Sequence, residues 1–179
     1  PGRILGRLSD LGWGQRLRAL LDEGDGPVPD DIVSACITVL AAWDWEQRPS
    51  SVIAVESPTH PVLSASLGAA LARVGRLENL GVLRLRHGHP AVSAANSAYR
   101  VAGLVDNWEQ PDDIEDTKGP ILLVDALTDT GWTMTMAARS LRQAGAESVL
   151  PRDSSAVGWP CRIMFMRASA QVATSISWP

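Results

Sequence analysis

One polar segment of the chain combines residue types that are suited to holding an anion. The apolar run 121–124 is followed by Asp125, then by a polar loop, and then by an apolar stripe with helical spacing. Backbone N–H groups at a helix start lack partners within the helix, and the helix dipole favours negative charge there. Glycine lets the backbone approach a bound oxygen, and threonine hydroxyls add donors. We therefore predict a site for one phosphate group, made by Thr128, Asp129, Thr130, Gly131, Trp132 and Thr133.

A plain strand-to-helix turn is the alternative for this loop. In that case Asp129 caps the helix, Thr133 lies in its first turn, and Asp125 is a strand-end residue without a ligand. Trp132 either packs beneath the loop or lies over the base or ribose of a ligand. The loop is no Walker A motif, because the Gly-x-x-x-x-Gly-Lys-Ser/Thr spacing is absent and the single lysine, Lys118, precedes the strand.

A second polar loop follows the apolar run 52–55. Its side chains Ser57, Thr59 and His60 could donate hydrogen bonds to an anion. The carboxylate of Glu56 would repel one, because like charges at close range are unfavourable. The alternative is a solvated turn before a helix that starts at Pro61, a residue that fits the first turn of a helix.

Histidines and cysteines do not predict a metal site. His87 and His89 flank a glycine at a spacing that metal ligands can have, but no further His or Cys lies near them. The two cysteines, Cys36 and Cys161, are far apart in sequence, which excludes a disulfide framework and a cysteine-based zinc site. We therefore expect no resident metal ion.

The elements that would position these loops alternate between helix and strand. Apolar residues at helical spacing predict helices over 14–21, 30–41 and 61–74 and after residue 132, and Gly145 ends the last one. Apolar runs predict strands at 52–55, 81–85, 121–124 and 148–150, while 87–100 and 106–118 read as a mobile loop and a surface connection. This alternation predicts an α/β fold with a doubly wound, mainly parallel sheet, whose ligand site lies at the carboxyl ends of strands.

Composition excludes several classes of protein. The chain has 179 residues, too few for a two-lobed motor, and 45% of them are apolar, enough for a packed core. Its 16 basic and 20 acidic residues give a net charge of −4, the wrong sign for wrapping a phosphate backbone. The apolar runs are too short to span a membrane. The start Pro-Gly-Arg lacks a signal segment and an initiator Met, so we expect a piece of a longer cytoplasmic protein.

Charge and composition divide the chain into three parts. Residues 151–179 hold 3 basic groups and 1 acidic group, a net of +2, which leaves 13 and 19, a net of −6, in 1–150. We expect an N-terminal helical segment (1–46) packed on a core (47–151). Residues 152–179 are expected to be an atypical tail, disordered or out of frame; in the alternative, 162–167 adds an edge strand.

The segment 122–133 resembles the signature of the phosphoribosyltransferase superfamily. That signature is an apolar strand, two adjacent acids, two spacer positions, and then Thr/Asp-Thr-Gly-x-Thr. The resemblance implies a type I phosphoribosyltransferase-like core, with 129–133 on the 5-phosphate of phosphoribosyl pyrophosphate (PRPP) or a nucleotide. It implies that Asp125 binds ribose hydroxyls and that Asp129 faces the base as the catalytic position. The loop with Ser57, Thr59 and His60 falls where the superfamily places its pyrophosphate loop.

The chain departs from that signature at Ala126, which stands where the second ribose-binding acid belongs. A missing carboxylate removes charge-assisted hydrogen bonds, each worth about 1.5–3 kcal/mol. It also weakens the grip on a complex of PRPP with Mg²⁺. We therefore expect transferase turnover to be absent or slow, and Ala126→Asp to tighten magnesium-dependent PRPP binding.

Across roughly residues 2–151 the sequence is similar to the C-terminal region of actinobacterial RecQ-family ATP-dependent DNA helicases. The similar segments are 11–21, 26–31, 39–45, 96–101 and 125–134. In that family the motor lies upstream and a phosphoribosyltransferase-like domain closes the chain. The resemblance implies helicase domains as partners in the same polypeptide, a parent role in DNA recombination and repair, and contact with DNA only through the parent.

Two classes of function follow. The first is a regulatory module that binds PRPP or a nucleotide phosphate and adjusts an attached helicase. The alternative is an active phosphoribosyltransferase of the nucleotide-salvage type, which would use Mg²⁺ with PRPP as cofactor and substrate. A docking domain with an empty loop is a third possibility. No membrane partner is expected under any of these hypotheses.

Overall fold

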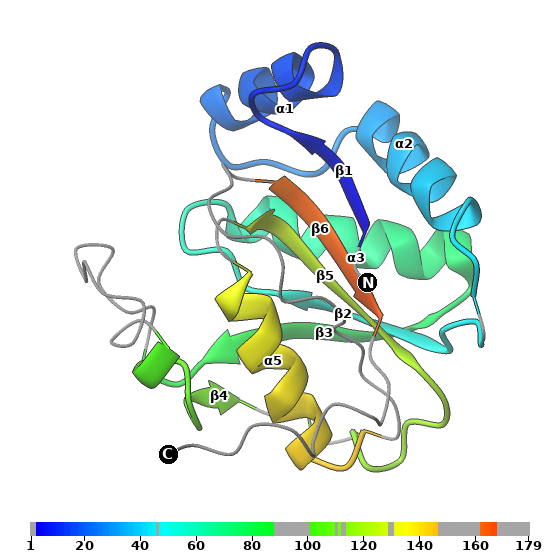
Figure 1. Cartoon of the computed structure of the whole chain (residues 1–179), viewed down its shortest axis with the longest axis vertical. Helices are drawn as coiled ribbons and strands as arrows, with labels where there is room; N and C mark the ends of the chain where they lie inside the picture. The colour runs from blue at the N-terminus through cyan, green and yellow to red at the C-terminus, as the bar shows by residue number, and fades with distance from the viewer. Residues whose placement is uncertain are drawn as a thin grey trace, which may run out of the picture.

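The computed structural model describes residues 3–45, 47–87, 101–109, 111, 114–128 and 131–146, together with the backbone of 162–167. Helices pack against a central mixed sheet, so the α/β class is confirmed (Figure 1). In the described part of the chain the sheet has six strands, in the order β1-β6-β5-β2-β3-β4. None of the helices described there is long and apolar enough to cross a membrane.

Three parallel strands form the centre of the sheet: β2 (Ser51–Val55), β3 (Glu78–Leu85) and β5 (Ile121–Thr128). All five residues of β2 are buried, as the apolar run 52–55 predicts for a strand covered on both faces. The predicted strand 81–85 is the second half of β3, which begins three residues earlier. Between Val52 and Ala54 the register shifts opposite β3, where Gly81 has a φ of 80°. This bulge admits the extra residue that separates the two halves of β3.

The flanking strands are antiparallel. The two-residue strand β4 (Trp108–Glu109) pairs with β3, while β6 (Arg162–Arg167) pairs with β5 on one side and β1 (Arg3–Arg7) on the other. The predicted surface connection 106–118 thus contains a strand, and its Trp108 is buried. Residues 162–167 lie inside the sheet and not at its edge. The predicted strand 148–150 and most of the predicted loop 87–100 lie outside the described residues.

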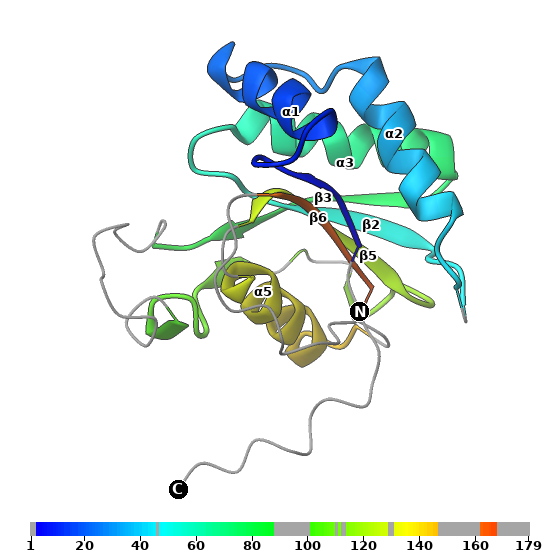
Figure 2. The same ribbon diagram turned by 45° about the horizontal axis from the view of Figure 1, so that its top comes forward.

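Helices cover both faces of the sheet (Figure 2). One face carries α1 (Trp13–Asp22), α2 (Asp30–Ala41) and α3 (Pro61–Gly75), and the other carries α5 (Trp132–Gln143). Two apolar clusters correspond to these faces. Leu122 and Val124 of β5 pack with α1, α2 and α3, whereas Ile121 and Leu123 pack with α5. This alternation along β5 puts Asp125 and Ala126 on opposite faces, and the register shift between Asp125 and Thr128 interrupts it at the end of the strand.

Residues 3–45 are an integral part of the fold: β1 belongs to the sheet, and α1 and α2 form a layer over one of its faces. Leu17, Leu20 and Ile32 are buried in the same cluster as Val52 of the central sheet. Cys36 is buried there as well, and this burial raises the pKa of its thiol to about 12. The layer therefore lies directly over the carboxyl end of β5, where it determines which residues a ligand can reach.

Candidate functional site

The chain leaves β2 and β5 in opposite directions. After β2 it passes through α3 to β3, and after β5 it enters α5 on the opposite face of the sheet. β2 and β5 are neighbours, so their carboxyl ends lie on either side of a topological switch point. Open α/β sheets bind ligands in the crevice outside such a point. The two loops that the sequence singles out, 56–60 and the one after Thr128, both start there.

Gly131 is the residue that turns the chain into α5. It has a left-handed backbone conformation, with φ 77° and ψ −3°, at the N-cap position. The Thr135 N–H and the Thr135 hydroxyl both donate to the Gly131 carbonyl, each at 3.0 Å, which locks the first turn. Gly131 has no side chain of its own to cap this helix start. The first N–H groups of α5 have no partners within the helix, so they are available to a side chain from elsewhere, to water or to a ligand.

The predicted phosphate-binding residues that the structure describes lie around this turn. Thr128 is buried at the end of β5, Gly131 and Thr133 are half-buried, and Trp132 is 41% exposed. Asp129 and Thr130 lie outside the described residues. The N-cap of α5 is Gly131, so Asp129 does not occupy the cap position that the alternative interpretation assigns to it.

Asp125 lies in the interior. Its side chain is only 3% exposed, and its Oδ1 accepts a hydrogen bond from the Leu127 N–H at 3.0 Å. Burial raises the pKa of its carboxyl to about 7, although the hydrogen bond from Leu127 acts in the opposite direction. The register of β5 against β6 shifts between Asp125 and Thr128, so this hydrogen bond spans a bulge. A ribose hydroxyl could reach Asp125 only after the strand end rearranged.

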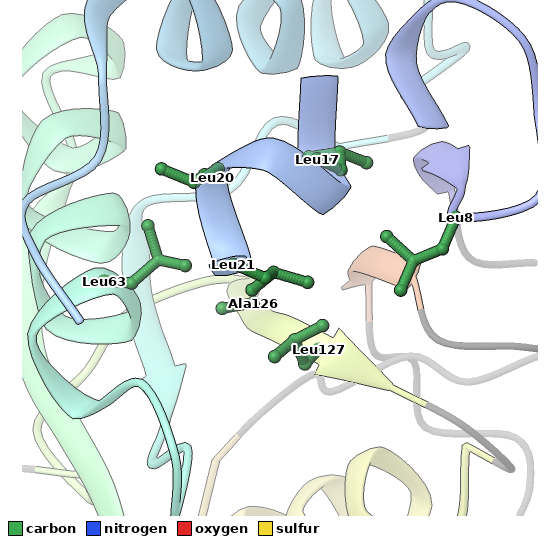
Figure 3. A pocket seen from close by; sticks show the side chains of 7 residues that line it. All are labelled: Leu8, Leu17, Leu20, Leu21, Leu63, Ala126 and Leu127. Carbon is green, nitrogen blue, oxygen red and sulfur yellow. The ribbon is translucent and has the colours of Figure 1, made fainter. Parts of the chain in front are cut away.

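Ala126 points to the opposite face, under the N-terminal layer. It is 1% exposed and belongs to the cluster that contains Leu17, Leu20 and Leu63. Figure 3 shows Ala126 and Leu127 of β5 beneath these leucines. The seven side chains enclose a cavity of about 10 Å³, room for one water at most, and its apolar lining gives a water no partners. This face of the strand end is closed, and the cavity is no ligand site. Its lining is Leu8, Leu17, Leu20, Leu21, Leu63, Ala126 and Leu127.

The side chains of the 56–60 loop bind one another and α1. The Oγ of Ser57 accepts the His60 N–H at 3.2 Å, and Thr59 Oγ1 lies 2.8 Å from His60 Nδ1. His60 Nε2 lies 3.4 Å from the Leu21 carbonyl oxygen. A neutral imidazole satisfies both contacts, with Nε2–H donating to the carbonyl and Nδ1 accepting the threonine proton. The three predicted pyrophosphate contacts therefore already have partners within the chain.

Asp25 is a site residue that the sequence analysis missed. Its two carboxylate oxygens accept the N–H groups of Val62 at 2.9 Å and Leu63 at 3.0 Å, in the first turn of α3. Asp25 comes from the connection between α1 and α2, 37 residues before Val62. In the sequence Asp25 lies between Gly24 and Gly26, shortly after the helix predicted over 14–21, and no local signal indicates that its carboxylate caps a distant helix.

The carboxyl end of β2 carries a further acidic group, Glu56. Its Oε1 forms an ion pair with Arg84 Nε of β3 at 3.4 Å. Among the described residues, no three His, Cys, Asp or Glu side chains gather into a metal-binding group.

In comparisons with protein-family models, with curated proteins and with solved structures, nothing matches the chain. Its function has to be argued from its own residues.

Proposed function

We propose that this chain is a module that binds a small phosphorylated ligand, of the PRPP or nucleotide type, at the start of α5. The observation that carries the proposal is the left-handed Gly131 at the N-cap of α5, next to the β2–β5 switch point. A helix start of this kind offers several N–H groups and a favourable dipole to one phosphate. The half-buried Thr133 adds a hydroxyl, and the exposed Trp132 offers an aromatic face to a sugar or base.

Binding without turnover is favoured over an active magnesium-dependent transferase. The one acid described at the end of β5, Asp125, is buried and has a raised pKa, and its neighbour Ala126 packs under leucines. Mg²⁺ prefers exposed carboxylate oxygens that keep several waters in its shell. The described residues at this strand end therefore do not fit a complex of Mg²⁺ with PRPP, and no catalytic step is derived through it.

The resemblance to RecQ-family helicases extends the proposal to a parent protein. In that hypothesis the chain is a phosphoribosyltransferase-like domain that closes a DNA helicase and senses a phosphorylated ligand on behalf of the motor. What supports it is the resemblance of the segments 11–21, 26–31, 39–45, 96–101 and 125–134 to that family, together with an α/β core in which β5 ends at Thr128, inside the last of these segments. No matching family model or curated relative adds to this resemblance. Motor domains of the same polypeptide would be the partners, and DNA would be contacted through them.

Gly131→Ala is expected to weaken the binding of ribose 5-phosphate about tenfold. A left-handed conformation costs a non-glycine residue about 1–2 kcal/mol, so the loop would leave the geometry that aims its N–H groups at a phosphate. Thr133→Val should weaken binding about fivefold, the worth of one neutral hydrogen bond. Isothermal titration calorimetry of the full chain measures both effects.

Gly12→Ala is the control for backbone strain at another helix start. Gly12 is also a helix N-cap with a positive φ, 78° against 77° for Gly131, and a Cβ at either position meets nothing within 4 Å. Its ψ is −107° against −3° for Gly131, so alanine at residue 12 lies outside the left-handed helical region and is strained at least as much, at a helix start away from the proposed site. Thr38→Val, on the exposed side of α2, controls for the loss of a hydroxyl. Equal affinities in all five proteins would show that the phosphate is not held at α5.

The isolated chain is expected to have neither ATPase nor unwinding activity, because it contains no Walker A motif. Its binding to duplex DNA should be weak and should fall steeply with salt, since residues 1–150 carry a net charge of −6. Fluorescence anisotropy with a labelled duplex at two salt concentrations measures this. Submicromolar affinity at physiological salt would contradict the expectation.

A further inference from the structure

The first N–H groups of α3 are hydrogen-bonded to a carboxylate of the chain itself. Asp25 accepts one hydrogen bond from each of the Val62 and Leu63 N–H groups, at 2.9 and 3.0 Å. Two oxygens on two adjacent helix-start amides is the arrangement that a bound phosphate or carboxylate ligand adopts. Of the two helix starts beside the β2–β5 crevice, that of α3 is thus occupied by Asp25. At α5 the N-cap is Gly131, which has no side chain of its own to cap the helix.

The connection that carries Asp25 is fastened to α3 on both sides of the residue. Before it, the Leu21 carbonyl lies 3.4 Å from His60 Nε2; after it, the Val28 N–H donates to Ser66 Oγ at 2.8 Å. Leu21 also packs beside Leu63 around the leucine-lined cavity (Figure 3). These contacts and its own two hydrogen bonds place the exposed Asp25 at the helix start.

The same side of the crevice carries a second carboxylate. Glu56 directly follows β2, and its ion pair with Arg84 leaves the side chain 29% exposed. An incoming anion at the α3 amides would meet the carboxylate of Asp25, which repels it. The charge of Glu56 is offset by Arg84, so Asp25 is the main source of this repulsion. The donors of the 56–60 loop give little compensation, because the Thr59 hydroxyl and the His60 ring already have partners. The buried Ser57 accepts the His60 N–H and keeps its hydroxyl proton.

We propose that Asp25 is a specificity-determining residue, which closes the α3 side to anionic groups and restricts the ligand to a phosphate monoester held at α5. The inference rests on the proposed function and narrows it. Ribose 5-phosphate or a nucleoside monophosphate presents one phosphate and satisfies the site. PRPP presents a second anionic group that would have to displace Asp25, so this group adds nothing to its affinity.

The test compares ribose 5-phosphate with PRPP by calorimetry on the full chain, in magnesium-free buffer. The unmodified protein should bind the two with affinities within about threefold of each other. Asp25→Asn should tighten PRPP binding about tenfold and leave ribose 5-phosphate unchanged, because it removes the charge and keeps one acceptor for the α3 amides. Asp30→Asn makes the same change in the first turn of α2 and should alter neither affinity.

A second measurement follows the amide NMR signals of Val62 and Leu63 during titration with inorganic pyrophosphate. They should shift in Asp25→Asn and stay unchanged in the unmodified protein. Shifts of these two amide signals in the unmodified protein, or their absence in Asp25→Asn, would overturn the role of Asp25. An affinity of the unmodified protein for PRPP that is ten times its affinity for ribose 5-phosphate would overturn it as well. If the protein does not bind ribose 5-phosphate, but pyrophosphate still shifts the Val62 and Leu63 signals in Asp25→Asn, only the site at α5 is refuted.

Discussion

Replacing Ala126 by Asp is expected to lower the free energy of unfolding by about 3–5 kcal/mol at neutral pH, the cost of an uncompensated buried charge. Ala126 is 1% exposed and packs among Leu17, Leu20 and Leu63, none of which can accept or donate a hydrogen bond. The new carboxyl would stay protonated in the folded state to a higher pH than in the unfolded state. The loss should therefore be smaller at pH 4 and grow as the pH rises.

Urea unfolding followed by tryptophan fluorescence measures this loss. Ala65→Asp makes the same change on the exposed side of α3 and should alter the free energy of unfolding by no more than about 0.5 kcal/mol. By sequence resemblance alone, Ala126→Asp restores an acid and tightens magnesium-dependent PRPP binding. A stable Ala126→Asp protein with such binding would show that this strand end opens to a ligand, contrary to the packing of α1 over it.

The stability of the unmodified protein is expected to fall between about pH 4 and pH 7 because of Asp125. Burial raises the pKa of this carboxyl from 3.8 to about 7 in the folded state. Between these values the unfolded chain releases a proton that the folded protein retains, so stability present below pH 4 is lost as the pH rises through 7. A difference of about three pKa units corresponds to about 4 kcal/mol.

Asp125→Asn should remove this pH dependence. The amide cannot ionise, and its Oδ1 can still accept the Leu127 N–H. When the free energy of unfolding is measured at several pH values, that of the variant should rise relative to that of the unmodified protein as the pH increases above 4. Asp31→Asn is the opposite control, because the hydrogen bond from Arg16 lowers the pKa of Asp31 and its stabilisation is lost as the pH falls. Parallel curves for Asp125→Asn and the unmodified protein would contradict the burial of Asp125.

Local patterns predicted the elements that carry their own signal. The run 121–124 is a buried strand because its four apolar residues face packed layers on both sides, and Pro61 starts α3 where a proline fits. The sequence analysis did not predict β1 and β4, because these strands carry little local signal. β1 is a five-residue strand with arginine at both ends, β4 has two residues, and both owe their pairing to strands distant in sequence.

The place of the candidate site was predictable, and its chemistry only in part. A polar loop between the strongest strand and a helix lies at a strand end, as the alternation of elements implies. Which face each neighbour takes depends on tertiary packing: Asp125 is buried, and Ala126 lies under α1. The cap of α3 by Asp25 joins segments 37 residues apart, and no local pattern in either segment indicates that they are in contact.

The position of β6 has a consequence for how the protein is made. β1 pairs with β6, which follows β2, β3, β4 and β5 in the chain (Figure 1). During synthesis β1 therefore stays without its partner strand until all of these strands have emerged from the ribosome. Pairing between segments so far apart in sequence is also slow, because a long loop must close first. The arginines at both ends of β1, Arg3 and Arg7, suit this delay, since charge on an unpaired strand discourages association between nascent chains.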